Sequence, residues 1–219
     1  MKSIRFNPAK QCYEYTENDV LFTAAGLHGY LEKTFYPHLS ASSGGRRKKP
    51  SGGGSSKAIG KRVDSELESV ARREPAPKRG YHEFTVAILK HFKRIDHRVC
   101  GAQVPVRLRQ IQRVTQADVI TVDSAGQLWM WEIKTGGTLM LNRAQGTFSY
   151  GAPHGYGGRP CTTAARYELQ RHYTHRALVA EGLPLRASRV LVVRKTKDKR
   201  DGSEAGKVTC KEMENAPWL

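Results

Sequence analysis

The stretch that decides the fold runs from Gln116 to Gly136 and reads QADVITVDSAGQLWMWEIKTG. Apolar and polar residues alternate before and after its DSAG segment, which predicts two antiparallel strands joined by a tight turn. In a three-residue loop of this kind Gly126 supplies the left-handed position, and Asp123 then lies opposite Gln127. The turn therefore determines the register of the predicted hairpin.

Three charged side chains meet at one end of this hairpin. Counting back from the turn places Asp118 opposite Glu132, and Lys134 projects on the same face as Glu132 because side chains alternate along a strand. Facing carboxylates repel each other unless a cation lies between them. Mg2+ suits this position, since it prefers few carboxylates, retained waters and phosphate oxygens. Lys134 would polarise a water or neutralise charge on a phosphorus-bound oxygen. A strand end with three solvated charges is the alternative interpretation.

An Asp on one strand followed by Glu-x-Lys on the next is the signature of the PD-(D/E)XK nuclease superfamily. Through Asp118 and Glu132-Ile133-Lys134 the chain resembles that superfamily over roughly residues 60–195. The resemblance implies that Asp118 and Glu132, with the Ile133 carbonyl, hold one or two Mg2+ or Mn2+ ions. It also implies that Lys134 orients or deprotonates the attacking water.

A further motif resembles those of RecB-type and lambda-exonuclease-like nucleases. The segment GKRVDSEL, which begins at Gly60, is similar to their GxxxHxxL motif, with Asp64 in the place of a histidine beside the metal. The resemblance therefore implies that Asp64 joins the metal site. Glu68 and Glu83 are the alternative acids on the first two predicted helices.

Substrate contacts are expected on a later helix and an early strand. Gln170 and Tyr173 are similar to the QxxxY motif of RecB-type nucleases, although the pair is one residue closer here, and the resemblance implies that they contact DNA. Arg107 and Arg109 alternate to one face of a strand that begins at Val104. They would meet a phosphate backbone, or serve as edge-strand charges that deter aggregation.

The other apolar patterns complete the fold. They predict helices from Lys61 to before Pro75 and after Gly80, a strand from Val104, a helix over 162–181 and a strand over 188–194. This order matches the α-β-β-β-α-β core of the superfamily. We therefore expect an α/β (α+β), restriction-endonuclease-like fold with a mixed central sheet flanked by helices. A helix is also expected to bury Trp129 and Trp131, on the face opposite Glu132.

Composition indicates the partner. The net charge of +17 and the pI near 10.0 favour a polyanion, and DNA is the first candidate, with RNA not excluded. The four cysteines are too far apart for a zinc framework or a dense disulfide scaffold, so an intracellular setting fits best. We find neither a secretory signal nor an apolar run of membrane-spanning length, and expect no membrane partner.

Three regions follow from the composition along the chain. Residues 1–40 are rich in aromatic and apolar residues and are expected to pack on the core, and residues 61–219 form the nuclease-like domain. Residues 41–60 form a basic Gly/Ser-rich linker or arm. Its Arg46–Lys49 cluster would grip nucleic acid, act as a nuclear import signal, or simply solvate the linker. We therefore expect the protein to be located in the cytoplasm or in the nucleus.

A glycine-rich segment follows the central hairpin. Residues 135–160 interleave charged and aromatic side chains, which predicts a substrate clamp or, alternatively, a disordered insertion. The candidate clamp residues are Arg143, Tyr150, His154, Tyr156 and Arg159.

Together these features predict a Mg2+- or Mn2+-dependent deoxyribonuclease with weak sequence preference. The RecB-like motifs favour an exonuclease or an enzyme of repair, recombination or replication, and a viral source is compatible with them. Exonuclease and endonuclease activity both stay open. The competing hypotheses are a non-catalytic nucleic-acid-binding protein and a packaging protein with a basic arm.

Overall fold

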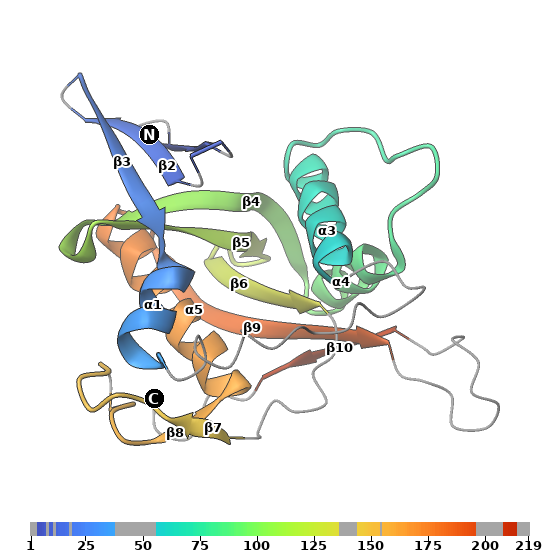
Figure 1. Ribbon diagram of the computed structural model, residues 1–219. Helices are drawn as coiled ribbons and strands as arrows, with labels where there is room; N and C mark the ends of the chain where they lie inside the picture. Colours follow the sequence, from blue (N-terminus) through green and yellow to red (C-terminus); the bar gives the residue numbers. More distant parts are fainter. Residues whose placement is uncertain are drawn as a thin grey trace.

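The computed structural model describes residues 4–7, 9–10, 12–17, 19–37, 56–135, 144–153, 155–195 and 208–213. They form a mixed α/β structure with a central mixed sheet flanked by helices, as predicted (Figure 1). The Arg46–Lys49 cluster and the candidate clamp residues Arg143 and His154 lie outside these described residues. Within them, no helix is long and apolar enough to cross a membrane.

The first strands form an antiparallel meander that joins the main sheet at its end. They are β1 (Ile4–Asn7), β2 (Cys12–Glu17) and β3 (Val20–Gly26). Only the last two residues of β3, Ala25 and Gly26, pair with β5 (Arg113–Asp123), in parallel. Helix α1 (Leu27–Phe35) follows directly and buries Leu27, Leu31 and Phe35. The described residues between Ile4 and Phe35 therefore contribute to both the sheet and the core.

Two helices cover one face of the main sheet. Helix α3 (Ser56–Ala71) buries Val63 and Leu67, and α4 (Glu83–Arg94) buries Phe84, Ile88 and Phe92, which recur at helical spacing. The predicted helix from Lys61 is thus correct but too short. Helix α3 begins within the segment predicted as linker, because Ile59 packs against the same core and extends the apolar face.

Among the described residues the main sheet has eight strands, with β1, β2 and β3 included. Strand β4 (His97–Leu108) pairs antiparallel with β5 and is an edge strand, and it begins earlier than the predicted Val104. Strand β5 pairs antiparallel with β6 (Leu128–Thr135). After α5 (Thr163–Ala180), β9 (Leu185–Lys195) returns parallel to β6, and β10 (Val208–Glu212) pairs antiparallel with β9. Apart from shorter elements between them, the helices and strands from α4 to β9 thus follow the order α4, β4, β5, β6, α5 and β9.

Two cores lie on the two faces of this sheet. Under α3 and α4, Trp131 packs against Phe92 with ring centroids 5.2 Å apart, whereas Met130 faces the core formed with α1 and α5. The prediction that a helix buries both tryptophans is right for Trp131, whereas Trp129 is only partly buried against the same core. Trp129 is half-buried and packs against His97, which follows the end of α4.

Described residues between β6 and α5, in the ranges 144–153 and 155–162, contribute to the core. It contains the two-stranded sheet of β7 (Ala144–Thr147) and β8 (Pro160–Thr162). Tyr156 is fully buried and packs against Phe148, at a centroid distance of 5.2 Å. Tyr156 therefore cannot contact a substrate as the clamp hypothesis requires, because its ring fills the core. Tyr150 is 93% exposed.

Candidate active site

The β5–β6 hairpin has the predicted register. Gly126 has φ of +76°, and the Asp123 amide donates to the Gln127 carbonyl at 3.0 Å. Paired residues run from Val122–Leu128 to Val119–Trp131. The next rung would set Asp118 opposite Glu132, as the sequence predicts.

The backbone hydrogen-bond ladder between β5 and β6 ends next to Asp118. Hydrogen-bonded pairs recur at every second residue of an antiparallel ladder, so a continued ladder would pair Ile133 with Ala117 after the Val119–Trp131 pair. Instead, the Ile133 amide donates to Asp118 Oδ2 at 2.7 Å. A side-chain carboxylate thus replaces a backbone acceptor, and β5 and β6 part at this point.

The side chains of β4 and β5 also switch from one face of the sheet to the other at this rung. Two of their register pairs, only two residues apart, pack into different cores: Ala102–Val119 under α3 and α4, and Val104–Ala117 with α1 and α5. Residues two apart on a regular strand share a face. The alternation is therefore broken at the residues between them, Gln103 and Asp118. Gln103 has a left-handed backbone with φ of +49°.

Lys134 lies among the acidic side chains. Its ammonium is ion-paired with Glu132 Oε1 and lies 5.0 Å from the ring centroid of Tyr167, on α5. Glu132 is fully buried, and its second oxygen, Oε2, has no hydrogen-bond partner among the described residues. The site thus contains a carboxylate that is only half satisfied.

Three carboxyl groups influence one another electrostatically at this site. Burial, and then the charge of Asp118, raise the pKa of Asp64 to about 6 and that of Glu132 to about 7. Burial likewise raises the pKa of Asp118. Burial lowers the pKa of Lys134, but Glu132 and Asp118 outweigh this effect, so that the net shift is upward. Lys134 is the positive charge that offsets the mutual repulsion of the acids.

The donor chemistry suits a hard divalent cation. Asp64, Asp118 and Glu132 offer oxygen ligands, and Glu132 Oε2 lacks a protein partner among the described residues. However, no group of three or more His, Cys, Asp or Glu side chains in that part of the chain has the geometry to hold a metal ion. In this conformation the Lys134 ammonium serves as the counterion, and a metal would have to displace it from Glu132.

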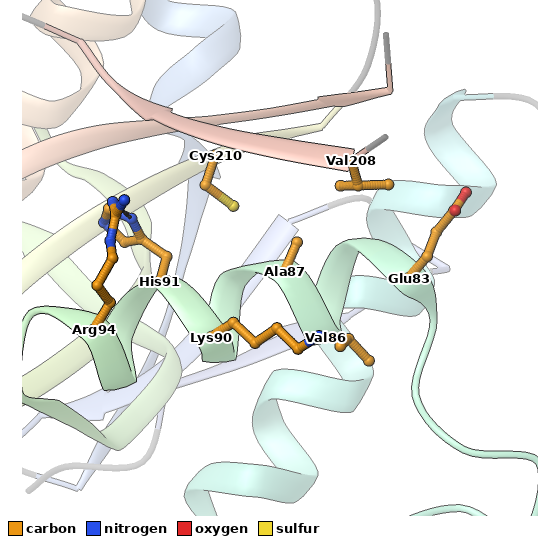
Figure 2. A pocket seen from close by; sticks show the side chains of 8 residues that line it. All are labelled: Glu83, Val86, Ala87, Lys90, His91, Arg94, Val208 and Cys210. Atoms are coloured by element: carbon orange, nitrogen blue, oxygen red, sulfur yellow. Dashed lines mark hydrogen bonds between the residues drawn. The ribbon is translucent and has the colours of Figure 1, made fainter. Parts of the chain in front are cut away.

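The alternative acids of the first helices have other roles. Glu68 is ion-paired with Arg72, 3.5 Å away. Glu83 is ion-paired with Lys195 at 3.1 Å. It lines a cavity of about 390 Å³ between α4 and β10 (Figure 2), which also contains His91 and Cys210. Of the three candidates, Asp64 is therefore the acid that interacts with Asp118.

The predicted arginines have internal partners. Arg107 is ion-paired with Glu17 and lies over the Tyr15 ring, 4.9 Å from its centroid. Arg109 lies in a 3-10 helix, η2 (Arg109–Ile111), because β4 ends at Leu108, and it pairs with Glu181 at 3.0 Å. The expectation that both project from one strand face is therefore wrong.

Helix α5 presents a residue to the site that the motif comparison did not select. Tyr167 contacts the Lys134 ammonium. Gln170 lies three residues further on, at a spacing that shares a helix face, and is half-buried. Tyr173 packs against the core formed with α1 and α5. Because Tyr167 shares a helix face with Gln170, the sequence spacing could have identified Tyr167 as a residue of this site. No local pattern identifies Gln103.

Comparison of the chain with protein-family models, with curated proteins and with solved structures found no match. A function is therefore inferred from the residues of this chain alone.

Proposed function

We propose that this protein is a metal-dependent nuclease of the PD-(D/E)XK type that hydrolyses phosphodiester bonds in DNA. The observation that carries the proposal is the convergence of Asp64, Asp118, Glu132 and Lys134 from α3, β5 and β6, at the point where the β5–β6 ladder ends. The order α4, β4, β5, β6, α5 and β9 supports a restriction-endonuclease-like core.

Each charged residue has a distinct role in this proposal. Asp118 and Glu132, with Asp64 and the Ile133 carbonyl, would hold Mg2+ or Mn2+. When bound, such an ion activates the attacking water and stabilises the leaving oxygen. Lys134, once released from Glu132, would orient that water as an ammonium, or accept its proton after first giving up its own. The Tyr167 ring holds the ammonium near the site by a cation–π contact.

The net charge supports a nucleic-acid substrate. A charge of +17 attracts a polyanion irrespective of its sequence, so we expect weak sequence preference. DNA is the proposed substrate, by resemblance to the RecB-type motifs, and cleavage of RNA under the same conditions is an outcome that the assay separates.

A non-catalytic nucleic-acid-binding protein is the second candidate. The observation that favours it is that Lys134 already offsets the acids without a metal ion. In that case the charged cluster stabilises the hairpin, and the net charge alone accounts for binding.

The deciding experiment is cleavage of labelled linear and circular DNA, and of RNA, with Mg2+, Mn2+ or EDTA. Variants Asp118→Ala and Lys134→Ala should bind DNA but not cut it. The ion pair of Glu83 and Lys195, on α4 and β9, provides matched controls, so Glu83→Ala and Lys195→Ala should cut normally. Tight binding by the wild type without cleavage under any metal would leave the second candidate.

A further inference from the structure

Gln103 has an unusual backbone for its place in the fold. Five non-glycine residues in the described part of the chain have a positive φ, and four of them lie in turns or between elements. Gln103, at +49°, lies inside β4. A left-handed residue within a strand is unfavourable for any side chain with a Cβ atom, and such strain persists where the surrounding structure or a functional site requires it.

Its side chain is directed to the proposed active site. The register of β4 and β5 places Gln103 opposite Asp118, at the rung where both strands change face. The amide is close enough to lower the pKa of Asp118. Its nitrogen, Nε2, is nevertheless buried and has no hydrogen bond of ordinary geometry among the described residues. A buried amide donor whose hydrogen bond falls short of ordinary geometry calls for an explanation.

We propose that Gln103 is the positioning residue for Asp118. The Ile133 amide holds the carboxylate from the β6 side at 2.7 Å, and Gln103 approaches it from the opposite strand, β4. The Gln103 amide already interacts with the Asp118 carboxylate in the metal-free protein. This hydrogen bond would reach ordinary geometry when a cation replaces the Lys134 ammonium and the carboxylate reorients. Gln103 thus acts on the cation through Asp118. This inference rests on the proposed function, but the contact between Gln103 and Asp118 can be tested without a metal.

The chain offers a matched control. Gln112 is the same residue type with nearly the same backbone, φ of +50°, but it follows η2 and is exposed. Gln103→Gly and Gln112→Gly both remove a left-handed side chain, so both relieve the same backbone strain. Only the first removes an amide that faces Asp118. Differences between the two variants therefore report the role of the side chain.

The first measurement is a double-mutant cycle of thermal unfolding in EDTA. The change in Tm caused by Gln103→Gly should differ by about 2 °C or more between the wild type and Asp118→Ala, because residues in contact do not contribute additively. Gln112→Gly should change Tm equally in both backgrounds. If Gln103→Gly changes Tm equally in the wild type and in Asp118→Ala, the proposal is overturned.

The second measurement is the affinity for Mn2+ alone, by titration calorimetry. Gln103→Gly should weaken Mn2+ binding by about 10-fold or more, as expected for a residue that orients a ligand. Gln112→Gly should leave it unchanged. Unaltered affinity in Gln103→Gly would also refute the positioning role.

A failure of the proposed function gives a different result. A wild type that binds no Mn2+ would refute the metal-dependent nuclease, while the cycle in EDTA would still decide whether Gln103 holds Asp118.

Discussion

The carboxylate of Asp118 accepts the amide proton of Ile133, and this bond marks the separation of β5 from β6. Asp118 is thereby held between two strands, beside Glu132, rather than on the surface of a continuous ladder. Two acids and a lysine that are separated in sequence become one electrostatic unit. Most of the expected behaviour of the protein follows from this unit.

The stability of the metal-free protein should fall as the pH rises. Between pH 4.5 and about 7 the folded protein keeps a proton on Glu132 that the unfolded chain has lost, so the free energy of unfolding decreases through this window. Because Asp64 also keeps a proton, the free energy of unfolding decreases in the same way as the pH rises from 3.8 to about 6. Thermal unfolding in EDTA from pH 5 to 8 measures the effect. Glu132→Gln should flatten the profile, and Glu83→Gln should not.

Removing the Lys134 charge should destabilise the metal-free protein strongly. Lys134→Met leaves buried carboxylates without a counterion, which costs roughly 3–5 kcal/mol. Mg2+ should restore part of the loss, because it supplies the missing positive charge, although cleavage stays absent. Lys195→Met, which removes an exposed partner of Glu83, should change the free energy of unfolding little. Equal effects of the two variants would contradict the assigned role of Lys134.

Glu132→Gln should separate stability from activity. The substitution removes a buried charge whose Oε2 has no partner among the described residues, so Tm at pH 8 should rise in EDTA. Cleavage should be lost, because the amide is a poor ligand for a hard cation. Calorimetry and the DNA assay together check the prediction, and a Glu132→Gln variant that cuts normally would exclude Glu132 from the site.

Tyr156→Phe should leave cleavage intact and raise stability slightly. The Tyr156 hydroxyl is buried without a hydrogen-bond partner in the described part of the chain, and removing such a group stabilises by about 1 kcal/mol. Urea unfolding measures this change. A loss of DNA affinity would instead revive the clamp hypothesis for this residue.

DNA binding should depend steeply on salt and survive the loss of catalysis. With six or more phosphate contacts, affinity should fall by about 10³-fold between 50 and 200 mM salt. Asp118→Ala should keep the same slope, since it removes no positive charge. Fluorescence anisotropy with labelled duplexes of two unrelated sequences tests both this slope and the expected weak sequence preference.

The central hairpin could be predicted because its signals are local. The glycine at 126 and the alternation around it determine the turn, and the turn determines the register of Asp118 and Glu132. The stripe on α4 was predictable for the same reason, since Phe84, Ile88 and Phe92 recur at helical spacing.

The remainder depends on contacts that sequence spacing does not encode. At Gln103, which has a left-handed backbone, the side chains of β4 and β5 change the sheet face to which they point. No glycine at this position in the sequence indicates this change. The partners of Arg107 and Arg109 lie 90 and 72 residues away in the chain. The core position of Tyr156 likewise results from tertiary packing, which overrides the polar and glycine-rich character of its segment.

The pairing of β3 with β5 has a consequence for biosynthesis. Helix α1 is translated early, but the strand against which it packs begins about 90 residues later, at Arg113. At roughly 5–20 residues per second, the nascent chain needs on the order of 4–18 s to supply that strand. During this delay the apolar face of Leu27, Leu31 and Phe35 has no β5 to cover it. Ribosome stalling before β5 would therefore prolong the time in which the nascent chain is prone to aggregation.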